Sequence, residues 1–187
     1  MEATLRSELI GVEEYLKDEK FAEVRHEFVA GQVFAMAGAS EEHNLIAGNL
    51  FAALHAHLRG KRCRVFTNDM KVRLYVSAAD VFYYPDVMVT CEPRDSERYF
   101  KCFPKVVVEV LSPETERTDR REKFVSYTQI ESLEEYVLTA QDKMEVTVFR
   151  RANHWRPELL TKNDQQLRLA SLDFSLPLRA IYEGVKV

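Results

Sequence analysis

Two apolar runs, each containing one acidic residue, stand out in the hydrophobic pattern of the chain. Residues 104–113 read Pro-Lys-Val-Val-Val-Glu-Val-Leu-Ser-Pro, and residues 85–89 read Pro-Asp-Val-Met-Val. Short valine-rich runs bounded by proline are typical of strands that are buried on both faces. A carboxylate in such a strand is costly unless it meets a cation or several hydrogen-bond donors. The pattern therefore points to a divalent-metal site that uses Asp86 and Glu109.

The rest of the pattern predicts helices alternating with strands. Ser40 is a good N-cap residue, and the apolar positions that follow it recur at helical spacing as far as Leu58. The other expected elements are a short amphipathic helix over 11–19, a hairpin over 24–36 that turns near Ala30-Gly31, a helix over about 117–130, and strands at 63–67, 70–76, 135–138, 144–149 and 154–160. This order predicts an α/β (α+β) fold with a mixed central β-sheet flanked by helices. We expect residues 1–187 to form a single domain.

Composition narrows the class of protein. The chain has 187 residues and a formal net charge of −4, which argues against broad, non-specific coating of nucleic acid. The three cysteines form neither a C-x-x-C pair nor a zinc-finger spacing, so we expect reduced thiols in a cytoplasmic protein. The first five residues carry no basic-then-apolar signal, and no apolar run approaches the length of a membrane span.

The types of residue in the two acidic strands favour a particular metal. Alternation along a strand places Val107, Glu109 and Leu111 on one face. Asp86 begins the other strand, so the two carboxylates can meet if the strands are neighbours. Mg²⁺ takes one or two carboxylates together with water and substrate phosphate oxygens. No histidine or cysteine is placed to complete a zinc site.

The spacing of these acids resembles a known nuclease pattern. Pro85-Asp86, followed 23 residues later by Glu109, is similar to the motif of the PD-(D/E)XK nuclease superfamily. The stretch 108–115, Val-Glu-Val-Leu-Ser-Pro-Glu-Thr, with its downstream polar residues, resembles a bacterial restriction-endonuclease-like family classed as a domain of unknown function. Those downstream residues are Asp119, Lys123 and Tyr127. The resemblance covers most of the chain and implies a restriction-endonuclease-like core with an N-terminal β-hairpin.

The resemblance also implies an activity and residue roles. It implies a metal-dependent endonuclease that hydrolyses DNA phosphodiester bonds, in which Asp86 and Glu109 hold Mg²⁺ or Mn²⁺ with help from the Val110 carbonyl. The superfamily lysine expected two residues after Glu109 is replaced by Leu111. In the narrower family this lysine has moved to the following helix, which makes it Lys123. Two further candidates for the site are His43 and Glu27. Relatives that cut duplexes often act as dimers, so a homodimer is expected.

Other interpretations of these residues remain open at this point. Glu109 can form a buried ion pair with an arginine such as Arg73, and Lys123 can be an exposed partner of Asp119 four residues earlier. The missing lysine at Leu111 and the acidic net charge also fit a catalytically inactive nuclease-fold module that binds nucleic acid or regulates another protein. A third interpretation is metal-dependent hydrolysis of another phosphoester.

Overall fold

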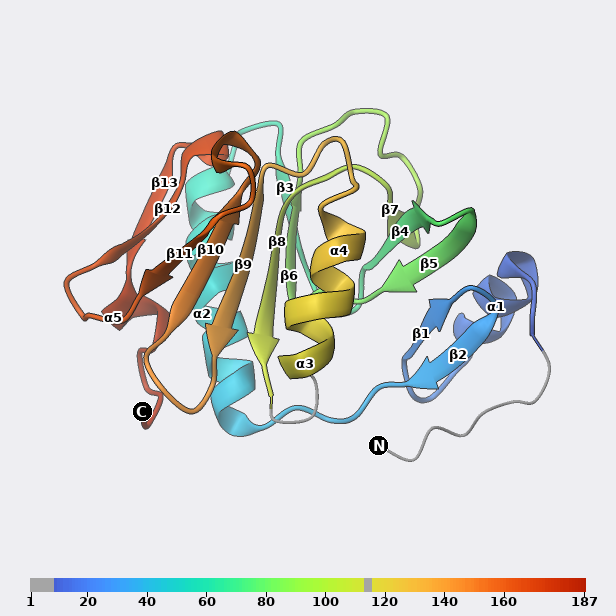
Figure 1. Ribbon diagram of the computed structural model, residues 1–187, viewed down its shortest axis with the longest axis horizontal. Coiled ribbons are helices and arrows are strands. Elements are labelled where there is room, and N and C mark those ends of the chain that lie inside the picture. The colour runs from blue at the N-terminus through green and yellow to red at the C-terminus, as the bar shows by residue number, and fades with distance from the viewer. Residues whose placement is uncertain (1–8, 113–115) are drawn as a thin grey trace.

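A six-stranded mixed sheet forms the centre of the protein in the computed structural model, which describes residues 9–112 and 116–187 (Figure 1). Its strand order is β11 (Pro157–Leu160), β10 (Val146–Arg150), β9 (Glu135–Ala140), β8 (Pro104–Leu111), β6 (Val87–Thr90) and β3 (Arg64–Thr67). Strands β8 and β9 are parallel, and the other neighbours in this sheet are antiparallel. The last part of the 108–115 motif and the N-terminal segment lie outside the described residues.

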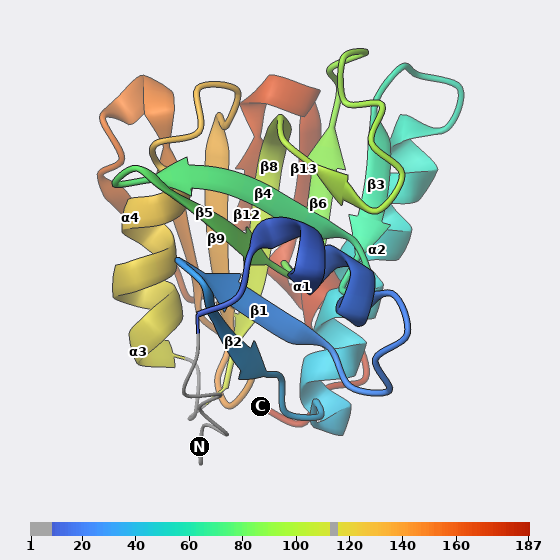
Figure 2. The ribbon, with the colours of Figure 1, turned by 90° about the vertical axis from the view of Figure 1, so that its right-hand side faces the viewer.

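A second sheet carries the N-terminal hairpin beside the central sheet (Figure 2). Its order is β2 (Gln32–Ala35), β1 (His26–Val29), β5 (Ala79–Tyr83), β4 (Lys71–Val76) and β7 (Phe100–Lys101). The hairpin turns at Ala30-Gly31, where both residues have positive φ, as a tight two-residue turn requires. Helix α1 (Val12–Glu19) packs on this sheet through Tyr15, whose ring stacks on Phe28.

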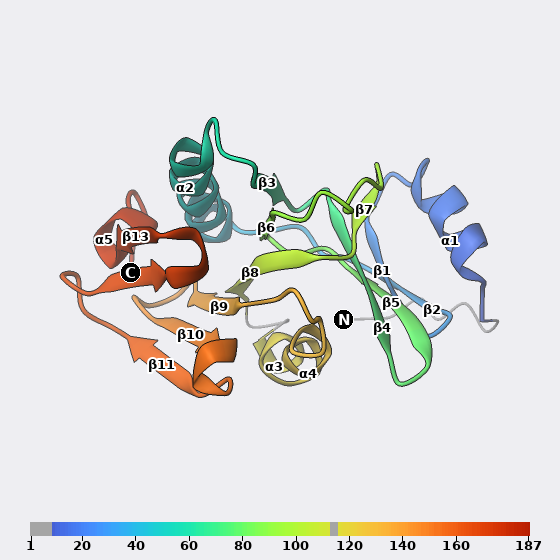
Figure 3. The same cartoon turned by 90° about the horizontal axis from the view of Figure 1, so that it is seen from above.

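Helices cover both faces of the central sheet (Figure 3). Helix α2 (Glu41–Leu58) lies on one face, with Ser40 as its N-cap. The other face carries a helical segment of three pieces, namely α3 (Glu116–Thr118), a π-helical turn (Asp119–Lys123) and α4 (Phe124–Tyr127). The chain ends with β12 (Gln166–Leu169), β13 (Phe174–Pro177) and α5 (Leu178–Ile181), and two 3₁₀ turns lie at Arg151–Asn153 and Ala170–Leu172. No helix in the described part of the chain is long and apolar enough to cross a membrane.

Side-chain alternation along β8 divides the core into two layers and sets the direction of Glu109. Val106, Val108 and Val110 pack on the α2 side, with Ile46 and Leu50. Val107 and Leu111 pack on the opposite side, with Tyr127 of α4. Glu109 therefore points toward the layer between the central sheet and α4.

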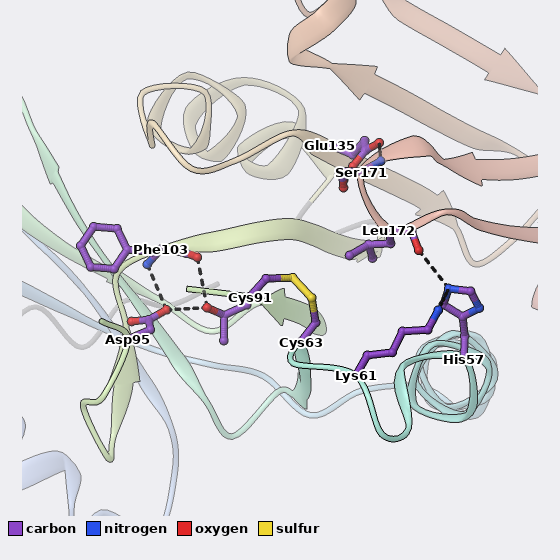
Figure 4. The surroundings of a disulfide bond; sticks show 10 residues. His57, Lys61, Cys63, Cys91, Asp95, Phe103, Glu135, Ser171 and Leu172 are labelled. Atoms are coloured by element: carbon purple, nitrogen blue, oxygen red, sulfur yellow. Dashed lines mark hydrogen bonds between the residues drawn. A yellow bond between two sulfur atoms is a disulfide. The ribbon is translucent and has the colours of Figure 1, made fainter. Parts of the chain in front are cut away.

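A disulfide corrects the expectation of reduced thiols. Cys63 directly precedes β3 and Cys91 directly follows β6, so the antiparallel pairing of these strands places the two residues opposite each other, and the structure joins them (Figure 4). Cys102 remains a free thiol. The sequence pattern could not reveal this pairing, because it depends on which strand becomes the neighbour of β6.

The predicted mixed sheet, flanking helices and N-terminal hairpin are all present in the structure. Several elements differ from the prediction. Strands β5 and β7, the β12–β13 hairpin and helix α5 were not predicted, and the helix expected over 117–130 begins at Glu116 and ends at Tyr127.

Candidate functional site

The two acids singled out by the strand pattern lie next to each other. Asp86 directly precedes β6, and the β6–β8 pairing sets Val87 opposite Val108, which places Asp86 beside Glu109. Asp86 Oδ2 accepts a hydrogen bond from the Val110 backbone N–H at 2.7 Å. Glu109 Oε2 in turn accepts from the Asp86 backbone N–H at 3.4 Å. Both side chains are buried.

Lys123 reaches the same site from the π-helical turn. Its ammonium lies 2.9 Å from Glu27 Oε1, 3.2 Å from Asp119 Oδ1 and 3.5 Å from Glu109 Oε1. The lysine is buried, so the interpretation of Lys123 as an exposed partner of Asp119 is wrong. Arg73 instead pairs with Asp80, so it is not the cation that meets Glu109.

Glu27 enters the site from the N-terminal hairpin. It lies in β1, which pairs with β2 on one side and β5 on the other, and extends to the ammonium of Lys123. Its Oε1 also lies 3.4 Å from the backbone N–H of Tyr84, two residues before Asp86. The hairpin therefore closes one side of the cluster around Lys123 and Glu109.

His43 contacts Asp86 from the first turn of α2. The Ser40 hydroxyl accepts from the His43 backbone N–H, which fixes the start of the helix, and His43 Nε2 lies 3.2 Å from Asp86 Oδ2. Burial lowers the pKa of His43, but contact with Asp86, the charge of Asp119 and a hydrogen bond to the Val110 backbone together raise it above its ordinary value. The protonated imidazole is thus favoured beside the carboxylates.

Glu109 and Lys123 are both buried, and each affects the pKa of the other. Burial raises the pKa of Glu109 well above its usual range, against the lowering effect of the Lys123 charge. Burial works in the other direction on Lys123, but three carboxylates outweigh it and raise the pKa of the ammonium. Tyr127 donates a hydrogen bond to Glu109 Oε1 at 3.0 Å, and burial raises the pKa of this phenol. The phenol therefore stays protonated and remains a donor.

The cluster carries more negative than positive groups. The cluster contains four carboxylates, those of Glu27, Asp86, Glu109 and Asp119. The cations that contact them are Lys123 and, when protonated, His43. Buried carboxylates in excess of their cations repel each other and favour an additional cation.

The residues at this position fit a hard divalent cation. Asp86 and Glu109 are adjacent oxygen donors, and the Val110 backbone lies beside them, with its N–H bonded to Asp86. Within the described residues, no three His, Cys, Asp or Glu side chains are grouped closely enough to form a metal site by themselves. Mg²⁺ needs no such group, because water and substrate phosphate oxygens supply most of its ligands. The donor set therefore suits Mg²⁺ or Mn²⁺ better than zinc.

Sequence reasoning did not assign a site role to Asp119. Its side chain is 2% exposed and faces Lys123 from the preceding turn of the same segment. The four-residue spacing between the two was visible in the sequence, but that spacing is equally common on exposed helices. The Asp119–Lys123 pair differs from an exposed pair because the helical segment is buried against the second sheet.

Comparisons with known proteins identify the relatives of this chain. The profile of a family described as "Uma2: Putative restriction endonuclease" matches residues 12–179. An uncharacterized protein of Synechocystis sp., slr1290, is 34% identical over 175 residues, covering 92% of this chain and 91% of the relative. A second, sll1609, is 33% identical over 138 residues, covering 72% and 77%. The crystal structure of a protein from Anabaena variabilis, titled a putative nuclease belonging to DUF820, superposes with a TM-score of 0.74 at 18% identity, covering 92% of this chain and 97% of that one. That likeness shows a shared fold.

Proposed function

Because the chain belongs to the Uma2 family, we propose that it is a metal-dependent endonuclease that hydrolyses phosphodiester bonds in DNA. The family and the nuclease-like fold support the coarser part of this proposal, a nuclease. The proposal of metal-dependent cleavage rests on one observation. The buried side chains of Asp86, Glu109 and Lys123 lie together at one end of the central sheet. Two adjacent carboxylates with a lysine beside them are the groups that metal-assisted cleavage of a phosphodiester requires.

Asp86 and Glu109 would hold Mg²⁺ or Mn²⁺, with the Val110 carbonyl as a further oxygen donor. The bound ion would supply an activated water and neutralise charge on the scissile phosphate. The Val110 N–H and Tyr127 O–H fix the carboxylates of Asp86 and Glu109, so these acids are oriented before any ligand arrives.

Lys123 would stabilise the negative charge that develops on the phosphate. A single preorganised donor in such a role is worth roughly 3–4 kcal/mol of transition-state stabilisation. Glu27 and His43 complete the site from the two flanking elements. Glu27 contacts the ammonium of Lys123, and His43 contacts Asp86.

The proposal includes a homodimer. The cytoplasmic location stays a prediction, and the Cys63–Cys91 disulfide removes the reduced thiols on which it partly rested. Each site cuts one strand, so a duplex-cutting enzyme of this type needs two copies. This expectation rests on the resemblance to the PD-(D/E)XK superfamily, and the oligomeric state can be measured by light scattering with and without a DNA duplex.

The test is cleavage of plasmid, linear and single-stranded DNA with Mg²⁺ or Mn²⁺, comparing wild type with Glu109→Ala and Lys123→Ala. We expect wild type to cut and both variants to lose cleavage while circular dichroism shows that they remain folded. Loss of cleavage in Glu109→Ala but not in Lys123→Ala would support the metal site and contradict the role proposed for Lys123.

A second candidate function is a nuclease-fold binding module without turnover. It is favoured by Leu111 in place of the superfamily lysine and by the three carboxylates that already surround the Lys123 ammonium. Mn²⁺ binding and DNA binding by wild type, with no cleavage of any substrate in the panel, would select this function over the first.

A further inference from the structure

We propose that Asp119 is a positioning residue that, together with Glu27, holds the ammonium of Lys123 beside Glu109 in the orientation that the reaction uses. The inference rests on the proposed function, because it concerns how the catalytic lysine of that site is aimed. Asp119 itself contacts neither metal ligand in the described contacts, and acts through Lys123.

The first argument is the number of acids around one cation. A single carboxylate neutralises a buried ammonium, yet Lys123 has three within 3.5 Å. Each additional buried carboxylate carries a desolvation penalty of its own. Glu109 also lies beside Asp86, where it would hold the metal. The side chains of Glu27 and Asp119 contact no other side chain than Lys123 among the described contacts, so only the lysine accounts for the presence of both acids.

The second argument comes from the distances. Glu27 and Asp119 lie closer to the ammonium than Glu109 does, at 2.9 and 3.2 Å against 3.5 Å. Lysine is a point charge on a flexible four-carbon stem, so contacts from several directions are needed to fix its position. Acids from β1 and from the preceding part of the helical segment hold the charge near Glu109 without tying it to that carboxylate.

The third argument is the way in which Asp119 is presented. Its carboxylate is buried, and Oδ1 makes an ion pair with Lys123 but receives no hydrogen bond from the described residues. Its main chain is fixed, because the Tyr136 hydroxyl donates to the Asp119 carbonyl at 3.0 Å. A structural acid is normally satisfied by several donors, whereas this one is fixed through its backbone and leaves its charge directed at the lysine.

The experiment compares Asp119→Asn with Glu122→Gln, an exposed acid on the same π-helical turn. Cleavage is measured as separate kcat and KM values. The ammonium of Lys123 is observed by ¹⁵N NMR of lysine-labelled protein, and its resonance is identified by its absence from Lys123→Arg. A buried, fixed ammonium should give a resolved resonance in wild type, because its protons exchange slowly with water.

We expect Asp119→Asn to lower kcat by about tenfold or more, equal to at least about 1.4 kcal/mol in the barrier, with KM within about twofold of wild type. The Lys123 ammonium resonance should broaden or disappear in the same variant, and Glu122→Gln should change neither. Asp119→Glu, which keeps the charge, should recover part of both signals, and it is the variant to use if Asp119→Asn unfolds.

An unchanged ammonium resonance in Asp119→Asn would overturn the inference, even if cleavage fell, because Asp119 would then act by another route. Loss of the resonance with no change in kcat would overturn it as well. If wild type cuts no DNA, the proposed function fails on its own. The resonance in Asp119→Asn would still decide whether Asp119 holds the lysine.

Discussion

The two ends of strand β6 both carry buried polar groups, and they differ in how completely these groups are satisfied. At the end of the strand, Asp95 is 1% exposed and accepts hydrogen bonds from the Thr90 hydroxyl and from the Cys102 and Phe103 backbone N–H groups. Figure 4 shows the bond from Phe103. The Cys63–Cys91 disulfide closes the same end. At the start of the strand, Asp86 lies among acids that outnumber their cations. Two buried atoms there, His43 Nδ1 and Asp119 Oδ1, have no hydrogen-bond partner among the described residues.

We interpret this difference as the contrast between a polar cluster that stabilises the fold and the cluster that we propose binds a metal. A buried acid with three donors needs nothing more, and its removal affects folding. A buried acid with too few partners is retained at a cost to stability, which is the usual condition of a functional site. The same short strand thus links a structural end to a candidate catalytic end, and substitutions at the two ends should separate stability from activity.

The largest effect is expected at the start of β6. Asp86→Asn should lower metal-dependent cleavage by about a thousandfold or more, equivalent to about 4 kcal/mol in the barrier. The asparagine side chain can still accept from the Val110 N–H, so the melting temperature should change little. Cleavage assays and thermal unfolding measure the two quantities, with Asp80→Asn, which alters an acid outside the cluster, as the control. Full activity in Asp86→Asn would remove the metal site from the proposal.

The disulfide at the other end is expected to contribute next. It links residues 28 apart in sequence, and closing a loop of that size stabilises a fold by about 3.6 kcal/mol in chain-entropy terms. A reductant should therefore lower the urea midpoint of wild type, and Cys63→Ser should show the lowered midpoint with or without reductant. Cys102→Ser keeps the bond and should respond to reductant as wild type does. Identical wild-type midpoints in both conditions would show that the bond adds no stability.

Loss of the acid at this end should lower stability without a change in chemistry. Asp95→Ala leaves the Thr90 hydroxyl and two backbone N–H groups without their acceptor, so the free energy of unfolding should fall by about 2 kcal/mol. Urea unfolding measures this loss, and the cleavage rate per folded molecule should stay at the wild-type value. Glu92→Ala, in the same loop, should leave the midpoint close to wild type. A selective loss of cleavage in Asp95→Ala would erase the contrast between the two ends.

The smallest effect is expected for the tyrosine that orients Glu109. Tyr127→Phe removes the donor to Glu109 Oε1 and should lower the free energy of unfolding by about 1 kcal/mol. Tyr83→Phe is a matched control, because the Tyr83 hydroxyl only approaches Ser126 Oγ at 3.5 Å and should matter less. Equal effects of the two substitutions would mean that the bond to Glu109 adds nothing to stability.

Much of the fold followed from hydrophobic spacing and capping. Ser40 and the apolar stripe ending at Leu58 define α2, and the proline-bounded valine run defines β8. Strand β5 was missed because the turn before it, at Ser77-Ala78, has positive φ at two residues that carry no turn signal of the Asn-Gly kind. The β12–β13 hairpin was missed for a similar reason, since its residues are joined by a 3₁₀ turn and Asp173 rather than by glycine.

Local spacing predicted only the two acids of the site, and the resemblance to the nuclease family added Lys123, His43 and Glu27 as candidates. Asp86 and Glu109 were assigned together because each sits in a strand that is buried on both faces. The closeness of Glu27 to Lys123 depends on how the second sheet packs against the helical segment, which no local pattern encodes. The same packing buries Asp119 and turns an ordinary i, i+4 pair into part of a charged cluster.

The parallel pairing of β8 and β9 also has a consequence for the order in which the protein becomes active. Lys123 lies in the connection between these two strands, whereas Glu27 and Asp86 come from segments synthesised earlier. Contacts between segments distant in sequence form late in folding, because the loop between them must first close. The Tyr136 hydroxyl of β9 donates to the Asp119 carbonyl, so the helical segment is held in its final place only when β9 has paired with β8. Under the proposed function, we expect a chain truncated before β9 to carry Asp86 and Glu109 without a fixed Lys123 and to leave DNA uncut.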